Sequence, residues 1–234
     1  MGTVNLSKVT VNLTKGDVVN LSKQSAGLKK VIVALGWDEN KGKTRTVTET
    51  VQPGLLGRLF GAQPKEVTRK VETSQYDFDL DAWVCLLKDG NVAPGESIVY
   101  YGYRDARDNN GNTFIHHCGD NLTGEGEGDD EQIIINLDKI PSDYNGIVVG
   151  VTIYKGYSRD QTFGNIDNMF VRVVDTNDNF EICRYSDSIA QEYKNCYTFI
   201  AGKLYKDKGE WHFKSAGYGT QDKSIESAVH NYKG

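Results

Sequence analysis

The 234-residue sequence has only four prolines and lacks any long apolar run. No stretch approaches the roughly 18 apolar residues that a membrane-spanning helix needs, so the sequence predicts no such helix. The first residues also lack the charged-then-apolar pattern of a secretory signal peptide. Leu6 stands where the myristoylation pattern requires serine or threonine. We therefore expect neither a leader peptide nor a lipid anchor.

Cysteines are few and form no CxxC pair; they are Cys85, Cys118, Cys183 and Cys196. With 38% hydrophobic residues, the chain has enough apolar material for a core, which excludes wholesale disorder. A chain of this length does not need disulfides to fold. We interpret the four cysteines as reduced thiols and predict a cytoplasmic location.

Basic residues do not dominate, since the formal net charge is -5. The segment 120–131 (DNLTGEGEGDDE) has six acidic residues and no basic one, so the rest of the chain is close to neutral. Phosphate contacts need a basic stripe, and nucleic acid is therefore not expected as the main partner.

Alternating apolar and polar residues, the period of β-strands, run through most of the sequence. Near-identical segments, VNLSK, VNLTK and VNLSK, start at residues 4, 11 and 19 and predict two or three strands. A turn at residues 15–17 suggests a hairpin between the second and third segments. Further strands are expected at 31–35, 78–87, 98–103, 113–117, 132–137, 147–154, 170–174, 180–184, 198–205 and 211–215.

Asparagine, aspartate and glycine turns separate these short strands, a pattern typical of an antiparallel sandwich. Helical periodicity is clearest at residues 224–232, with Asp222 or Ser224 as the N-cap. A short helical turn is also expected within 159–164. We therefore predict one all-β domain over residues 1–234, an antiparallel β-sandwich of two sheets with a short C-terminal helix.

Residues 39–73 interrupt this pattern of strands and turns, and we expect no core strand in this segment. The segment contains PGLLGRLFG (53–61) between Thr, Lys, Arg and Glu stretches and has a net charge of +3. A loop of this length is long for a compact domain. It is either folded back on the body or a tip that docks onto a partner or a membrane.

Two acidic segments have the composition of a site for a hard cation. In the segment 76–82, Asp77, Asp79 and Asp81 would share one face of a strand, about 7 Å apart. Like charges in such a row destabilise a sheet unless solvent or a cation neutralises them. The acidic loop, residues 119–131, alternates oxygen ligands with glycines that permit tight turns.

Calcium is the metal that best fits these segments, at two adjacent sites, because it takes six to eight oxygen ligands. No Cys or His cluster accompanies the carboxylates, which disfavours zinc, copper and iron. The acidic loop is not a phosphate loop, since acidic residues follow its last glycine. A solvated acidic loop without a metal is the remaining alternative.

Several motifs closely resemble the TerD family of tellurium-resistance and general stress proteins. They are both acidic segments, the element LGWD (35–38), the opening repeats and QTFG (161–164). The resemblance runs from Val4 to about Tyr232, and the Gly/Leu-rich insert is similar to that of the TerZ branch. It implies a cytoplasmic, calcium-binding β-sandwich with a role in resistance to tellurite and other stresses, and no established catalysis.

Carried over by motif, the implied calcium ligands are Asp77, Asp79, Asp120, Asn121, Thr123, Glu125, Asp129, Asp130 and Glu131. Asp81 and Asp38 are weaker candidates, and Glu127 is expected to face solvent.

Three functions follow from this interpretation. The first is a calcium-dependent binding or scaffold module whose partners include other Ter-family proteins. The second is a C2-like protein that reads a membrane surface through calcium, helped by the basic insert. A metal-dependent hydrolase is the third. Calcium is a weak Lewis acid, and a pairing of Ser97 or Cys118 with a histidine such as His116 or His117 has no recognisable spacing, so we expect no enzyme.

Overall fold

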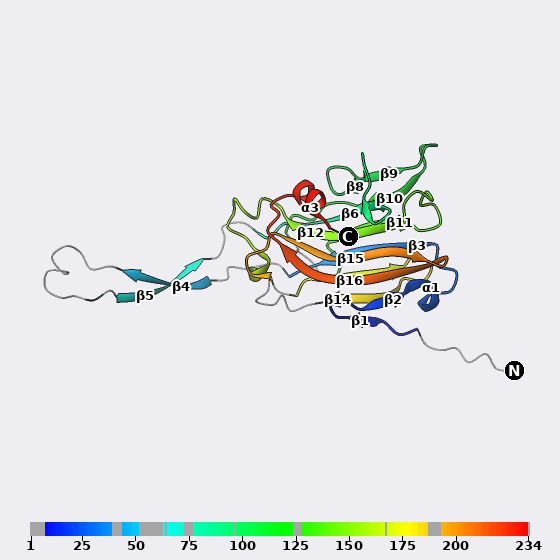
Figure 1. Cartoon of the computed structure of the whole chain (residues 1–234). Helices are drawn as coiled ribbons and strands as arrows, with labels where there is room; N and C mark the ends of the chain where they lie inside the picture. The colour runs from blue at the N-terminus through cyan, green and yellow to red at the C-terminus, as the bar shows by residue number, and fades with distance from the viewer. Residues whose placement is uncertain are drawn as a thin grey trace.

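The computed structural model describes residues 8–38, 44–51, 63, 65–72, 77–95, 97–123, 128–166, 168–186 and 193–233. Two sheets of seven strands each form a sandwich (Figure 1). The first sheet has the order β1 (Val11–Leu13), β14 (Phe180–Ser186), β13 (Phe170–Asp175), β3 (Lys30–Gly36), β11 (Glu131–Asn136), β10 (Thr113–His117) and β9 (Asp105–Arg107).

The second sheet has the order β2 (Val18–Asn20), β16 (Glu210–Thr220), β15 (Thr198–Asp207), β12 (Gly146–Ile153), β6 (Leu80–Lys88) and β7 (Asn91–Val92), and β8 (Ile98–Val99) also pairs with β6. The expected all-β sandwich is confirmed. A 3-10 turn, η1 (Phe163–Asn165), overlaps the end of the segment 159–164 that was expected to hold a helical turn.

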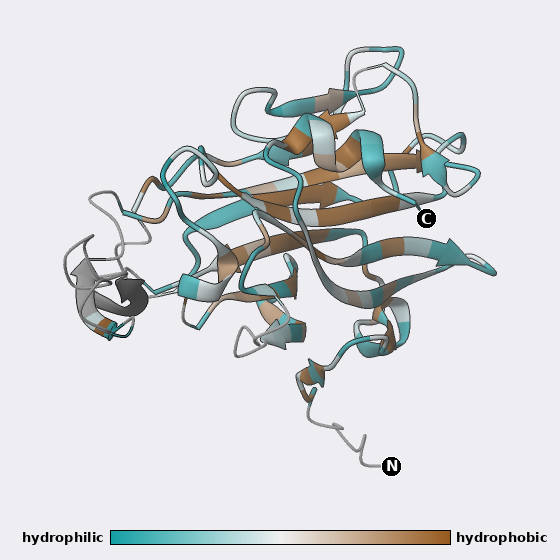
Figure 2. Cartoon of the chain, turned by 60° about the vertical axis from the view of Figure 1, so that its left-hand side comes forward, coloured by the Kyte–Doolittle hydropathy of each residue, from teal (hydrophilic) through white to brown (hydrophobic). Residues whose placement is uncertain are grey.

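Alternation of buried and more exposed side chains is typical of a strand in the first sheet, as in β11, which buries every second residue. By contrast, β6 and β12 are buried along nearly their whole length. One face of β6 meets the first sheet, while Trp83, Cys85 and Leu87 form a second apolar cluster under α3 (Ile225–Asn231). Figure 2 shows hydrophobic residues concentrated on these central strands and hydrophilic residues in the loops.

The C-terminal helix α3 begins as expected, because the Ser224 side chain accepts a hydrogen bond from the Ser227 backbone in a capping box. Its apolar residues Ile225, Ala228 and Val229 are buried. None of the described helices combines the length and the apolar character needed to span a membrane.

The expected hairpin at residues 15–17 is wrong. β1 pairs in parallel with β14 in the first sheet, whereas β2 pairs with β16 in the second. The turn at Gly16 therefore carries the chain from one sheet to the other. The third repeat is strand only to Asn20, whose side chain caps the short helix α1 (Leu21–Gln24) by accepting from the Lys23 backbone.

The insert 39–73 adds no strand to the two large sheets among its described residues, as expected, but it is not merely a loop. β4 (Thr44–Val51) and β5 (Lys65–Glu72) pair antiparallel as a separate two-stranded sheet. This hairpin extends beyond one end of the sandwich (Figure 1). The Gly/Leu-rich stretch 53–61 lies outside the described residues.

Candidate metal centre

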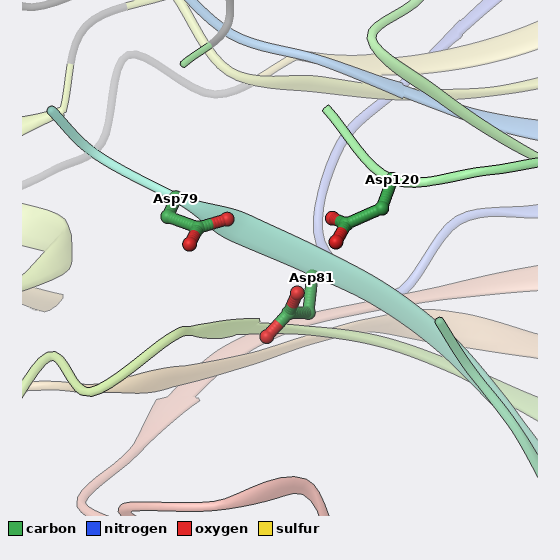
Figure 3. A group of neighbouring side chains, drawn as sticks. All are labelled: Asp79, Asp81 and Asp120. Carbon is green, nitrogen blue, oxygen red and sulfur yellow. The ribbon is translucent and has the colours of Figure 1, made fainter. Parts of the chain in front are cut away.

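Three carboxylates meet at one end of the sandwich. Asp79 precedes β6, Asp81 lies on β6, and Asp120 follows β10, so the group joins the second sheet to a loop of the first. One oxygen of each carboxylate lies within 4.8 Å of the others. Figure 3 shows the three carboxylates turned toward a common space. Asp79 and Asp81 are 5% and 4% exposed, while Asp120 is exposed.

Positive charge compensates this group only in part. Burial, with a further contribution from the Asp120 charge, raises the pKa of Asp79 to about 6. Burial also raises the pKa of Asp81 to about 9, and the charges of Glu131, Asp79 and Asp120 add to it. Asp79 Oδ1 is buried and has no hydrogen-bond partner among the described residues. Arg159 Nη1 lies 3.9 Å from Asp79 Oδ2 and compensates only in part.

Glu131 and His117 form a buried layer beside this group. Glu131 Oε2 accepts a hydrogen bond from the Ala82 backbone at 2.5 Å, while Glu131 Oε1 has no partner among the described residues. Burial raises the pKa of Glu131 to about 9. His117 accepts from the Gly119 backbone through Nδ1, and burial lowers its pKa to about 4. The imidazole is therefore neutral and carries its proton on Nε2, which lies 3.7 Å from Glu131 Oε2.

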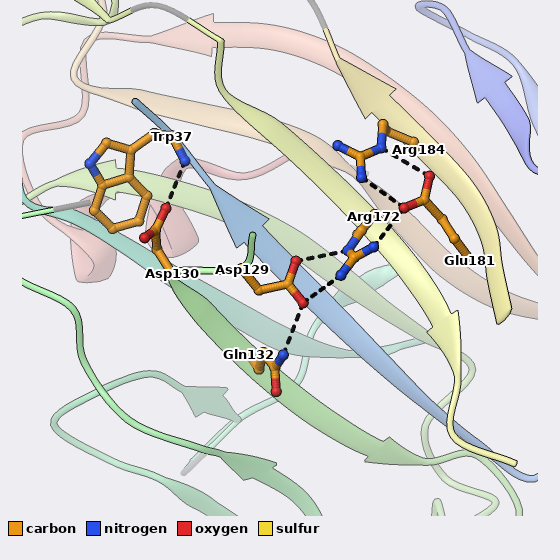
Figure 4. A network of polar contacts seen from close by, with 7 residues as sticks. All are labelled: Trp37, Asp129, Asp130, Gln132, Arg172, Glu181 and Arg184. Carbon is orange, nitrogen blue, oxygen red and sulfur yellow. Dashed lines mark hydrogen bonds and ion pairs between the residues drawn. The ribbon is translucent and has the colours of Figure 1, made fainter. Parts of the chain in front are cut away.

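Asp129 is held by an arginine instead of facing the group. Arg172 on β13 donates from Nε to Oδ1 at 2.7 Å and from Nη2 to Oδ2 at 2.9 Å, and Gln132 Nε2 donates to the same Oδ2 (Figure 4). The strand register explains why Arg172 and Gln132 meet at Asp129. Both residues pair with Ala34 of β3, so the three lie in one cross-strand row. The small Ala34 side chain lets both neighbours reach Asp129.

Glu181 extends this network. It accepts from Arg172 Nη1 at 2.8 Å and from Arg184 at 2.9 and 2.8 Å (Figure 4). Burial favours a higher pKa for Glu181, but hydrogen bonds from Arg184 and Arg172 outweigh it and lower that pKa. The Arg172 pKa is raised by its bonds to Asp129 and Glu181. Both carboxylates are therefore neutralised by arginine.

Asp130 forms hydrogen bonds that hold the two ends of the acidic loop in place. Its Oδ2 accepts from the Trp37 backbone and its Oδ1 from Asn121 Nδ2, both at 2.9 Å. Close approach to β3 requires Gly36, because a Cβ there would lie 2.6 Å from the Gly128 carbonyl oxygen. Burial raises the pKa of Asp130, against the lowering effect of the Trp37 bond.

The structure brings together two of the predicted ligands, Asp79 and Asp120, with Asp81, which the motif match treated as a weaker candidate. Asp77 is exposed and outside this group, and Asp38 accepts from Asn168 at 2.5 Å. Glu131 borders the group.

Asn121, Asp129 and Asp130 form hydrogen bonds that hold the loop, and Thr123 donates its backbone N–H to Asn121. Glu125 and Glu127 lie outside the described residues. The second calcium site stays a prediction.

Sequence reasoning missed Arg172 and Arg159. Arg172 is far in sequence from Asp129, as Arg159 is from Asp79, and neither arginine belongs to a motif, so no local signal could have identified these contacts. The sequence did indicate Asp81 as a candidate, since strand alternation places it on the same face as Asp79.

Comparison with known proteins identifies relatives along almost the whole chain. The TerD domain model matches residues 9–232. General stress protein 16U of Bacillus subtilis is 36% identical over 214 residues, covering 91% of this chain and 92% of that protein. Tellurium resistance protein TerD of Serratia marcescens is 32% identical over 212 residues, covering 90% of this chain and 91% of TerD. TerZ of the same organism has equal identity over 216 residues, 92% of this chain and 93% of TerZ.

The fold also has a solved counterpart. The crystal structure of a TerD homologue, SCO6318 from Streptomyces coelicolor A3(2), superimposes with a TM-score of 0.57 at 19% identity, covering 87% of this chain and 96% of that chain. The matches to TerD and TerZ do not differ in identity and so do not single out the TerZ branch. The extent of the family match shows that this chain is a member of the TerD family.

Proposed function

We propose that this protein is a calcium-binding member of the family that acts as a metal-dependent binding or scaffold module in a stress response. The observation that carries the proposal is the convergence of three carboxylate oxygens within 4.8 Å, with Asp79 Oδ1 buried and lacking a partner among the described residues. The names of the relatives, which refer to stress and to tellurium resistance, support the biological setting.

The donor set fits calcium. The carboxylates of Asp79, Asp81 and Asp120 are hard oxygen ligands, and Ca²⁺ prefers such ligands in flexible arrangements. When bound, the ion supplies the positive charge that the buried carboxylates lack. Because these carboxylates come from β6, from the residue just before it and from the loop after β10, binding would join the two sheets at this end.

A C2-like membrane reader is the second candidate function. Leu122, two residues after Asp120, is 59% exposed, so an apolar side chain projects beside the metal centre. Hydrolysis has less support, because the imidazole of His117 is fully buried and its Nδ1 accepts a backbone hydrogen bond. We therefore retain the prediction that the protein is not an enzyme.

We also propose a cytoplasmic location. The proposed partners are other Ter-family proteins, and nucleic acid is not the main partner. All four cysteines are free thiols, and three of them are buried, which supports folding in a reducing compartment.

A calcium titration tests the main proposal. Calorimetry of EDTA-treated protein should give a saturable isotherm. A hundredfold excess of calcium over Kd should stabilise the fold by about 2.7 kcal/mol, which raises Tm by about 5–10 °C for a domain of this size. Magnesium at the same concentration is the control. Equal melting in EDTA and in calcium would contradict the proposal.

A further inference from the structure

Two lysines lie directly opposite each other on the outer face of the second sheet. Lys203 on β15 and Lys214 on β16 are cross-strand partners. The adjacent pair, Leu204 and Phe213, belongs to the core, so strand alternation directs both lysines to the other face of the sheet. Like charges placed directly opposite each other destabilise a sheet unless solvent or an anion offsets their repulsion.

Both lysines line a hollow of about 380 Å³. Gly146 of β12 lies in the wall beside its cross-strand partner Tyr205, and its lack of a side chain leaves room there. The Tyr205 ring is stacked on the His212 ring, with the centroids 5.3 Å apart, and so presents a fixed surface. Lys206 also lines the hollow, and its Nζ lies 6.0 Å from the centroid of the Trp211 ring.

The charge of this hollow is positive. Among the residues that the structure describes, none of those lining it carries a carboxylate. Neither Lys203 Nζ nor Lys214 Nζ forms an ion pair within the described ranges. Asp143 and Glu210 lie on segments close to the hollow in sequence, but each is already paired with another lysine. The two opposed ammonium groups are therefore available to an anion from outside the chain.

This hollow is remote from the metal centre. Leu87, which lines it, is six residues along β6 from Asp81, a distance of about 20 Å in an extended strand. The pairing of β12 agrees, since Gly146 pairs with Leu87 and Thr152 pairs with Asp81 at the other end. At physiological ionic strength, exposed charges are largely screened beyond about 8 Å. The acidic group therefore does not cancel the positive charge of the hollow.

We propose that Lys203 and Lys214 bind the phosphate of a phosphate monoester in this hollow, independently of calcium. Such a phosphate carries a charge of about -1.5 to -2 at pH 7 and has several acceptor oxygens, which matches two ammonium groups. Leu87 and the Tyr205 ring form an apolar part of the wall for the carbon skeleton. The ester is borne by either a soluble metabolite or a lipid.

Calorimetry in EDTA with glycerol 3-phosphate as the probe tests the proposal. Wild-type protein should give a saturable isotherm, and its affinity should fall as salt is added. Lys203→Gln and Lys214→Gln should each weaken binding about tenfold, because a charge-assisted contact with the phosphate is lost. Lys65→Gln, on the separate β4–β5 hairpin, removes the same charge away from the hollow and should leave the affinity unchanged.

Thermal melting without ligand distinguishes a binding role from a structural one. Both glutamine variants should melt at the wild-type temperature or above it, because repulsion between the opposed lysines is removed. Lys203→Glu places opposite charges in the pair, so it should raise Tm further and abolish binding of the probe. Loss of binding accompanied by a lower Tm in all three variants would show a merely structural role and overturn the proposal.

Sedimentation in EDTA with vesicles of phosphatidylcholine, with and without phosphatidic acid, identifies the source of the phosphate. Pelleting that requires phosphatidic acid and is lost in Lys214→Gln indicates a lipid, whereas binding of glycerol 3-phosphate alone indicates a soluble metabolite. Absence of binding to either probe, or binding that is unchanged in both glutamine variants, overturns the inference. The calcium titration does not bear on this result, so the two proposals fail separately.

Discussion

Asp81 is buried on β6 with Asp79, Asp120 and Glu131 around it, and this position makes it central to the candidate metal centre. Strand alternation places Asp77, Asp79 and Asp81 on one face, but it does not tell which part of that face is covered. The strand begins only at Leu80, and Asp77 stays in solvent. Burial, which depends on residues distant in sequence, therefore decides which aspartates meet.

Asp81→Asn and Asp77→Asn form a matched pair of substitutions. We expect Asp81→Asn to weaken calcium binding about tenfold or more, because a carboxylate ligand becomes a neutral amide. It should also raise the stability of metal-free protein at pH 8, because folding no longer requires protonation of a buried carboxyl that is ionised in the unfolded state. Asp77→Asn should leave both quantities close to wild type.

Calorimetry and urea unfolding in EDTA measure the two effects. Equal losses of calcium affinity in both variants would show that the ion is held elsewhere.

The metal-free protein should lose stability as pH rises. Burial raises the folded-state pKa values of Asp81 and Glu131 to about 9, above the ordinary values of 3.8 and 4.5. Between those limits the folded state binds more protons than the unfolded state, so the free energy of unfolding falls with pH. We expect a loss of about 2 kcal/mol or more from pH 5 to pH 9 in EDTA.

Urea unfolding at stepped pH measures this loss. Saturating calcium should flatten the dependence, because the ion favours the charged carboxylates. A metal-free protein that is more stable at pH 9 than at pH 5 would refute the prediction.

At the scale of elements, the acidic loop is fixed by strands that are remote from it in sequence. Arg172 on β13 is 43 residues from Asp129, and Trp37 is 93 residues from Asp130. The composition of the loop predicts oxygen ligands, and the metal that they would bind stays a prediction. It could not show that Asp129 and Asp130 are engaged by sheet residues, because only the pairing of β3 with β13 and β11 brings those partners near.

Arg172→Gln should destabilise the protein by about 1–3 kcal/mol, since Asp129 and Glu181, both largely buried, would lose a charged partner. Calcium affinity should fall several-fold, because the loop that carries Asp120 would lose an attachment. Arg172→Lys should recover only part of both effects, since lysine cannot form the paired contact. Urea unfolding and calorimetry measure them.

Arg107→Gln is the control, because Arg107 pairs with Asp105 on the surface, where the contribution is about 0–1 kcal/mol. Equal destabilisation by the Arg107 and Arg172 substitutions would argue against the anchoring role.

Over the whole molecule, alternation and turn residues were enough to predict most strands and the sandwich. Alternation does not specify which strands are neighbours, and the hairpin expected at residues 15–17 proved to be a crossing between sheets. The β4–β5 hairpin was missed because its strands carry Thr, Lys, Arg and Glu, without the apolar face that marks a core strand.

Replacing residues 44–72 by a short Gly-Ser linker should leave the sandwich intact, because β4 and β5 pair only with each other. We expect a change in unfolding free energy below about 1 kcal/mol, since loop closure depends weakly on length, and an unchanged calcium isotherm. Thermal melting and calorimetry provide the measurement. Loss of cooperative melting would mean that the hairpin supports the body.

The crossing at Gly16 has one more consequence, for self-association. β1 covers the outer edge of β14, and β2 covers that of β16, so a single short segment shields one border of each layer. Proteolytic loss of that segment would bare two rows of unpaired backbone amides and carbonyls at once. A clipped molecule would then offer paired templates on which the released segment of a neighbour could dock, giving exchanged dimers or fibres.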